Sequence, residues 1–266
     1  MSICMVGGLA TYSFLRAEDV TAFSPNGHYE DLLTFEMDVA QISQLILLFC
    51  ESVGSYAELG SFCIEREITQ RLLVVVDDNK YQLDSFVRWG PLKYLEDIHT
   101  NAAVCVLNTD EISQGRGALE TDIDKDAFHR ILERSIRARV RAAAREHQSF
   151  DPTKSGHMIK LITGLIQDYG ALLEEEVDVI MYCIGHPISS AAFRRYALCA
   201  EAFGWIKKDR RDLFTYYTAT SQREAIRFKF THEPIDRSRW RTDIIQHWKT
   251  ADPARFESIQ ANRPSS

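Results

Sequence analysis

The chain has 266 residues, 45% of them hydrophobic, which is enough for one large or two ordinary domains with buried cores. No apolar run approaches the roughly 18 residues of a membrane span, and the first ten residues are too short and uncharged for a secretory signal, so we expect a cytoplasmic protein with no membrane partner. Its six cysteines show neither C-x-x-C nor zinc spacing; we expect reduced thiols, no metal and no bound cofactor.

The net charge of −7 is distributed unevenly. Up to Asp124 there are 7 Lys and Arg against 20 Asp and Glu, whereas from Lys125 onward there are 24 against 18. An acidic half joined to a basic half predicts domains with different partners, and the basic half is the candidate for nucleic-acid contact. We predict an α/β domain over 1–124, a basic helical connector over 125–150 and a helical domain over 151–266.

The first half reads as alternating helices and strands. A helix is expected over 30–42, with an apolar face and with Glu36, which could be an ordinary solvated charge. The apolar run 45–49 is typical of a strand buried on both faces of a parallel sheet, and 72–76 is a second such run. The helix expected between them, over about 57–67, implies a right-handed parallel crossover.

The turn after the first predicted strand reads Glu51-Ser52-Val53-Gly54-Ser55-Tyr56-Ala57-Glu58. Ligands of open parallel sheets bind at the carboxyl ends of strands, which is where this turn lies. Gly54 would let the backbone approach a ligand, and Ser55 is predicted to be the N-cap of the following helix. Glu58 could instead complement the helix macrodipole in the first turn.

A loop with the sequence Ser85-Phe86-Val87-Arg88-Trp89-Gly90-Pro91 is expected over the same edge of the sheet. Aromatic residues in such a loop are more often lids packed on a sheet than groups that stack on a base. The run 103–107 is the last strand expected in this domain, and 109–121 is predicted to be a linker or exposed loop.

The arginine-rich stretch 126–148 is predicted to be a helix, whose arginines either face solvent, with pairs such as Glu133 and Arg137, or bind a polyanion. Helices are then expected near 158–166 and 172–182, with a third that Ser189 or Ser190 caps. A basic-tipped hairpin follows over 205–217, and three helices followed by such a hairpin are the order of a winged helix. A closing helix is expected over 236–249, and a frayed tail after it.

In a winged helix the third helix enters the major groove and the hairpin meets phosphates. Candidate base contacts are Arg194 and Arg195. Winged helices also serve as protein-interaction modules, and this alternative stays open. The candidate phosphate contacts are Lys207, Lys208, Arg210 and Arg211.

Four ordered blocks within the first 110 residues resemble the nucleoside deoxyribosyltransferase-like superfamily, and within it the effector proteins encoded beside reverse transcriptases in bacterial retrons. These blocks are residues 31–36, 51–62, 71–76 and 85–91. Members of the family begin with a strand, a Gly-rich loop and a full helix, but here only a handful of residues separate Gly8 from Glu18. Since such a loop usually holds phosphates, we expect either that the start is placed too far downstream or that this protein binds its substrate poorly or not at all.

The resemblance implies a flavodoxin/Rossmann-like parallel sheet that lacks most of its first helix, and cleavage of the N-glycosidic bond of NAD or a related nucleotide. Glu58 would be the nucleophile, and Glu36 and Glu51 would bind the sugar hydroxyls. The remaining expected substrate-binding residues are Ser52, Gly54, Ser55 and Ser85.

The resemblance further implies a toxic effector of antiphage defence that arrests infected cells. Such effectors are held inactive by the retron reverse transcriptase and its multicopy single-stranded DNA linked to RNA, and their sites are often completed by a second subunit. Two alternatives remain open: a non-catalytic DNA-binding regulator with a nucleotide-sensing domain, and a nucleoside deoxyribosyltransferase of salvage.

Overall fold

The structure is a computed structural model, and the residues it describes are 13–16, 29–99, 102–112, 123–143, 149–221, 224–228 and 236–263. The predicted Gly-rich turn at 6–8 and the shortened first helix lie outside them. The chain divides into two compact units. Unit 1 contains Met1–Phe14 and Ser43–Ser149, and unit 2 contains Leu15–Ile42 and Phe150–Ser266.

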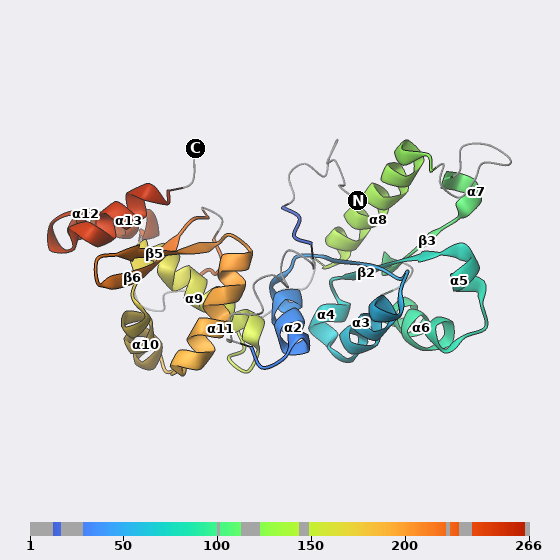
Figure 1. Cartoon of the computed structure of the whole chain (residues 1–266), viewed down its shortest axis with the longest axis horizontal. Helices are drawn as coiled ribbons and strands as arrows, with labels where there is room; N and C mark the ends of the chain where they lie inside the picture. The colour runs from blue at the N-terminus through green and yellow to red at the C-terminus, as the bar shows by residue number, and fades with distance from the viewer. Residues whose placement is uncertain are drawn as a thin grey trace. The chain divides into compact units, whose positions relative to one another are not determined.

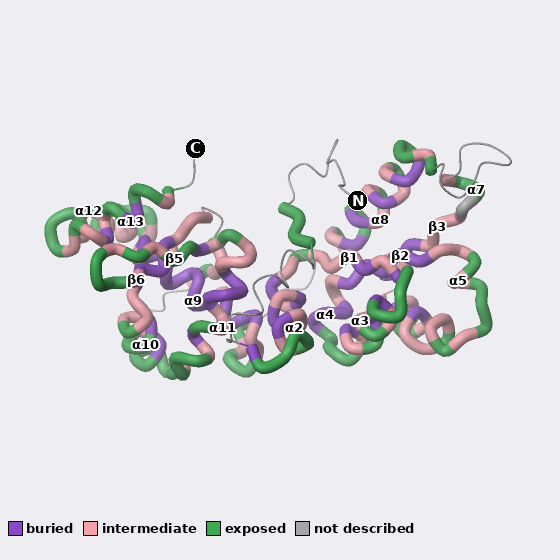
Figure 2. Tube along the Cα trace, viewed as in Figure 1, coloured by how far each residue is buried: buried purple, intermediate pink, exposed green. Residues whose placement is uncertain are grey.

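Within the described residues, unit 1 is built on a parallel sheet of three strands, β1 (Ile46–Phe49), β2 (Leu72–Asp77) and β3 (Val104–Leu107), in the order β1-β2-β3. The central strand β2 is almost wholly buried from Leu72 to Val76, which Figure 2 shows as a purple band. A strand covered on both faces by helices needs apolar side chains on both, and this explains its uninterrupted run of Leu and Val. The three strands coincide closely with those predicted.

The helices of unit 1 cover both faces of this sheet. α3 and α6 lie on one face and α8 on the other (Figure 1). The remaining helical segments are short and include a π-helical turn, η2, that runs directly into α6. The bounds are α3 (Val53–Ile64), α4 (Arg66–Thr69), α5 (Asp78–Gln82), η2 (Arg88–Leu92), α6 (Lys93–His99), α7 (Thr109–Ile112) and α8 (Lys125–Ala143).

The arginine-rich helix α8 belongs to unit 1, whereas we had predicted a connector between domains. Its apolar residues Phe128, Leu132 and Ile136 pack against the sheet. Arg139 is only 2% exposed, and its guanidinium donates hydrogen bonds to the carbonyls of Leu72, at 3.0 Å, and Thr69. A parallel sheet must be covered on its second face, and the amphipathic α8 satisfies this requirement.

Unit 2 combines helices with a small antiparallel sheet. α9 (Ser155–Tyr169), α10 (Glu174–Cys183) and α11 (Ser190–Ala202) precede the hairpin of β5 (Ile206–Arg211) and β6 (Phe214–Ala219). The short strand β4 (Ala171–Leu172), which was not predicted, pairs with β6. Two residues are too few for a period-2 pattern to reveal.

Two helices close unit 2, α12 (Arg237–Ala251) and α13 (Pro253–Ala261). The prediction of a frayed tail after residue 250 was wrong. Asp252 caps α13 through a bond from the backbone N–H of Arg255, and Ile259 is buried. The Asp-Pro pair at 252–253 is a helix-start pattern that we overlooked.

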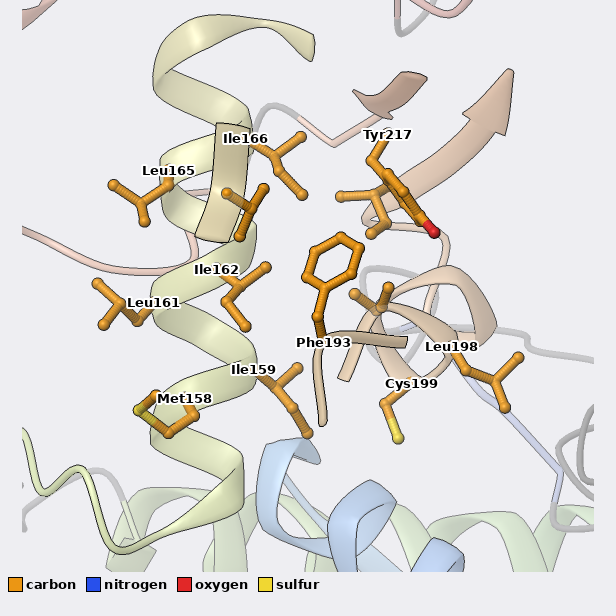
Figure 3. Packing of buried hydrophobic residues seen from close by; sticks show 14 of the residues in the cluster. Met158, Ile159, Leu161, Ile162, Leu165, Ile166, Phe193, Leu198, Cys199 and Tyr217 are labelled. Atoms are coloured by element: carbon orange, nitrogen blue, oxygen red, sulfur yellow. The ribbon is translucent and has the colours of Figure 1, made fainter. Parts of the chain in front are cut away.

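The core of unit 2 surrounds α9, whose side chains are buried along most of its length. Ile159, Ile162 and Ile166 point toward Phe193 of α11 and Tyr217 of β6 (Figure 3). The two aromatic rings meet edge to face with centroids 4.8 Å apart. This cluster holds the three helices and the hairpin together as one folded body.

The predicted helix at 30–42 forms as α2 (Leu32–Ile42), but it packs in unit 2, against α9 and α11. A buried polar cluster anchors it there. The Tyr29 hydroxyl donates to Asp38 at 2.8 Å and lies 3.0 Å from the sulfur of Cys199. Arg195 donates to the same carboxylate at 3.3 Å. Because Asp38 is buried, these partners replace the water that its charge would otherwise need.

This cluster predicts a loss of stability at alkaline pH. Burial raises the pKa of Cys199 to about 12, so the folded state retains the thiol proton more tightly than the unfolded state. The stabilisation is complete below about pH 9 and is lost as pH rises toward 12. Urea titrations at pH 7, 9 and 10.5 should show unfolding free energies that fall with a slope of at most about 1.4 kcal/mol per pH unit from this group.

Cys199→Ala should remove this part of the slope, and Cys183→Ala, at an exposed position, should leave it unchanged. Equal alkaline slopes in all three proteins would contradict the assignment.

Candidate active site and candidate nucleic-acid surface

The turn between β1 and α3 is closed by a reciprocal pair of serines. Ser52 is the N-cap of α3: its Oγ accepts a hydrogen bond from the backbone N–H of Ser55 at 3.2 Å. The Ser55 Oγ accepts in return from the backbone N–H of Ser52 at 3.0 Å and of Glu51 at 3.1 Å. Our prediction of Ser55 as N-cap was wrong, because the capping box starts the helix three residues earlier.

The earlier start places Glu58 in the second turn of α3, and the first turn contains no acidic residue. The interaction of a carboxylate with the helix macrodipole falls off within the first turn. Interaction with the macrodipole therefore contributes little at Glu58, and it does not explain why this position is acidic.

Glu58 is half-buried and lies near the end of β1. The pKa of the buried Cys50 thiol is raised to about 11, mainly by burial; Lys80 opposes the rise, and the negative charge of Glu58 adds to it. The Cys50 carbonyl accepts from the Tyr56 hydroxyl at 3.3 Å and from Lys80 Nζ at 3.5 Å. Glu58 thus lies at the edge of the sheet where the sequence predicted a ligand.

The other predicted residues of this turn differ in exposure. Glu51, Ser52 and Gly54 are exposed, whereas Ser55 is buried and also donates to the carbonyl of Ser52 at 2.8 Å. A Cβ at Gly54 would make only an ordinary contact, 3.7 Å from the Ser52 Oγ, so the fold itself does not require glycine there. Their contact with a substrate stays a prediction.

The capping serines should contribute measurably to stability. Ser52→Ala and Ser55→Ala should each lower the free energy of unfolding by about 1 kcal/mol, because each leaves backbone N–H groups of the turn without an acceptor. Urea unfolding measures both changes. Ser61→Ala is the control, because Ser61 bonds only to the carbonyl of Ala57 within the helix and should have a smaller effect.

Two predicted substrate-binding residues lie elsewhere. Ser85 begins the helical segment that contains η2: its Oγ accepts from the backbone N–H of Arg88 at 3.3 Å, and its carbonyl from Trp89 at 3.0 Å. Glu36 lies on α2, in unit 2, so its participation in a site of unit 1 stays a prediction.

The two aromatic residues of the segment 85–91 do not pack on the sheet, contrary to our prediction. Phe86 is 85% exposed and Trp89 is 60% exposed. Between them lies Arg88, which donates to Glu96 of α6 at 3.1 Å. Arg88 and Glu96 were not predicted, although an arginine between two aromatic residues and beside a Gly-Pro pair was a usable signal.

The six predicted nucleic-acid contacts fall into two groups. Arg194 donates to Glu174 at 3.1 Å, and Arg195 bonds to the buried Asp38. Arg211 bonds to Asp209 at 3.1 Å. By contrast, three cations of β5 have exposed side chains that form no ion pair within the part of the chain that the structure describes; they are Lys207, Lys208 and Arg210. Among the six predicted contacts, the cations available for a polyanion are therefore the three on β5.

The described part of the chain combines two features. One is a parallel α/β unit with a carboxylate near the end of β1, and the other is a helical unit with a basic hairpin. Together they define a two-unit α/β protein with a candidate active site and a candidate nucleic-acid surface. Residues 6–208 match the family described as STM3845 retron effector protein, and because this is most of the chain, the chain belongs to that family. The predicted relation to retron effectors is thereby confirmed.

Two curated relatives come from Escherichia coli. The chain is 28% identical over 98 residues to the "Retron Ec86 putative ribosyltransferase/DNA-binding protein". The matched region is 34% of this chain and 32% of that relative. The chain is 23% identical over 164 residues to the "Retron Ec73 putative ribosyltransferase/DNA-binding protein", which covers 59% and 50%. The matches thus span a third to a half of the relatives' length.

None of the described helices has both the length and the hydropathy needed to cross a bilayer. Nor do three or more His, Cys, Asp or Glu residues of the described part of the chain gather as they would around a metal ion.

Proposed function

We propose that this retron effector cleaves the N-ribosyl bond of NAD or a related nucleotide, with Glu58 acting at the anomeric carbon. The observation that carries the proposal is the position of Glu58: half-buried in the second turn of α3, beside the carboxyl end of β1. The curated relatives are named as ribosyltransferases, in agreement with chemistry at a ribosyl carbon.

Breaking an N-glycosidic bond gathers positive charge on the anomeric carbon. A carboxylate held beside that carbon stabilises the charge or attacks the carbon to form a covalent ribosyl-enzyme. In the covalent route the N-glycosidic bond breaks and the base leaves as the carboxylate bonds to the carbon; the oxygen of a water molecule then bonds to the carbon, the bond to the carboxylate breaks, and a proton of the water passes to solvent. Without a covalent intermediate, the water oxygen bonds to the carbon as the base leaves, and one proton passes to the base or to solvent. Glu51 would hold the sugar hydroxyls, and Ser52, Gly54, Ser55 and Ser85 would complete the substrate site in unit 1.

The test is chromatography of reaction mixtures. The purified full chain is incubated with NAD and a panel of nucleosides and nucleotides, and free base is quantified. Release of base from at least one substrate is expected. A chain that binds nucleotides but releases no base would support the non-catalytic regulator, whereas exchange of bases between free nucleosides would support a salvage transferase.

The proposal treats unit 1 as a nucleoside deoxyribosyltransferase-like catalytic domain and unit 2 as a winged helix. In unit 2 the order α9, α10, α11, β5, β6 supports this assignment. Its hairpin carries Lys207, Lys208 and Arg210, whose charge suits a phosphate backbone. The names of both relatives include DNA binding.

In the cell we propose that this activity is toxic to a phage-infected host. The reverse transcriptase and its multicopy single-stranded DNA and RNA would hold the effector inactive until infection. A branched nucleic acid is a dense polyanion, for which the basic hairpin offers a complementary surface.

A further inference from the structure

One exposed ring in unit 1 is held in a fixed orientation. The indole N–H of Trp89 donates a hydrogen bond to Asp84 at 2.7 Å, although the residue is 60% exposed. A solvent-facing tryptophan without such a bond would lose rotamer freedom on contact with a ligand. Here the chain itself has already restricted the ring, which leaves a large aromatic surface open to solvent.

The residues behind this ring form a stack of aromatic and cationic groups. The guanidinium of Arg88 lies 4.1 Å from the ring centroid of Tyr81 and 5.0 Å from that of Trp89. Glu96 binds both supporting groups: it accepts from Arg88 at 3.1 Å and from the Tyr81 hydroxyl at 2.5 Å. The carboxylate thus fixes the cation between two rings, and the stack ends at the exposed indole.

The backbone that carries the ring is also constrained. Trp89 lies in the π-helical turn η2, which contains Pro91, and such turns are frequent at functional sites. A Cβ at Gly90 would be 3.4 Å from the Phe86 ring, which therefore covers this turn closely. η2 packs against α3 and α5, the helices that follow β1 and β2. The turn η2, which carries Trp89, therefore adjoins α3, the helix that carries Glu58.

We propose that Trp89 is a binding residue for the planar heteroaromatic base of the nucleotide substrate, which stacks on the exposed indole while the sugar lies toward α3. This rests on the proposed function for its substrate class. The carboxylate Glu96 and the carboxylate Asp84 are positioning residues that hold Arg88 and the ring. An exposed indole held in a fixed orientation suits a flat heteroaromatic ring, because every base presents a π-face and stacking requires no base-specific hydrogen bond.

The test separates base binding from catalysis by using Glu58→Gln as the parent protein, so that no product forms. Isothermal titration with NAD and with ribose 5-phosphate, which lacks a base, is compared for three further variants. Trp89→Ala should weaken NAD binding about 10-fold or more, with no change for ribose 5-phosphate. Trp89→Phe, which retains an aromatic face, should stay within about 3-fold of the parent. Tyr94→Ala, at another exposed aromatic residue of the same unit, is the control and should match the parent.

Unchanged NAD affinity in Trp89→Ala, or equal weakening for NAD and ribose 5-phosphate, would overturn the proposal, as would the absence of any nucleotide binding. In the active chain, Trp89→Ala should raise KM and leave kcat nearly unchanged. If the active chain releases no base from any substrate, but Trp89→Ala still weakens binding of NAD and not of ribose 5-phosphate, the proposed hydrolysis is refuted and the base-binding site is retained. The two failures are therefore distinguishable.

Discussion

Replacing Glu58 by glutamine should lower the rate of base release by at least about 10²- to 10³-fold, with folding and nucleotide binding retained. Glutamine preserves the shape of the side chain but removes the negative charge that would face the anomeric carbon. The loss of one preorganised group that stabilises transition-state charge has effects of this size. The measurement is kcat for the best substrate of the panel, together with growth of cells that express each protein.

The matched control is Glu65→Gln, at an exposed acid that follows the last turn of the same helix. It makes the same change of charge at the other end of α3 and should retain both activity and toxicity. Equal activity of Glu58→Gln and the wild type would remove Glu58 from the mechanism, and an equal loss in both variants would indicate a general charge effect.

Removing the three exposed cations of β5 should weaken nucleic-acid binding by at least about 10-fold near physiological salt. Each cation that neutralises a phosphate releases about one counterion, so the slope of log affinity against log salt should decrease in magnitude by about 2 to 3. Fluorescence anisotropy with a labelled duplex between 50 and 200 mM salt measures both quantities. The triple variant is Lys207→Ala, Lys208→Ala and Arg210→Ala.

The control variant must make the same change of charge elsewhere in unit 2, with little effect on affinity or slope. It combines Arg227→Ala, Arg239→Ala and Lys249→Ala, at positions where the side chains are exposed. Equal weakening of nucleic-acid binding in both triple variants would show that net charge, and not the position of the hairpin cations, determines the affinity. No change in the hairpin variant would favour a protein-interaction role for unit 2.

Arg195→Ala should behave differently from the hairpin variant. Because Arg195 is bonded to the buried Asp38, its loss leaves that carboxylate less compensated and should lower stability more than affinity. In the structure this side chain joins α11 to α2, and its contact with DNA stays a prediction.

Much of the fold was accessible from local sequence patterns. The uninterrupted apolar runs predicted the three parallel strands, and Ser189, one of the two serines considered, is the N-cap of α11. The sequence could not reveal against which unit each amphipathic helix packs its apolar face. The apolar face of α2 fits the surface of α9 and α11, and that of α8 fits the sheet, but hydrophobic periodicity specifies a buried face and not its partner.

The candidate site was predictable in place but not in detail. The turn after β1 lies where the strand order required, yet the register of the cap depended on two serine hydroxyls that bond to each other's backbone. Either serine alone could have been the N-cap. The orientation of Trp89 likewise depends on Asp84, and its exposure on the packing of Arg88 against Tyr81, neither of which a linear pattern encodes.

The most direct test of the account is a crystal structure of the Glu58→Gln protein with its substrate bound. The account predicts that the amide replacing the carboxylate lies about 3 to 3.5 Å from the anomeric carbon of the ribose, the distance of a near-attack arrangement. A ribose bound away from α3, or a side chain at position 58 directed into solvent with no sugar in front of it, would contradict the assignment of Glu58.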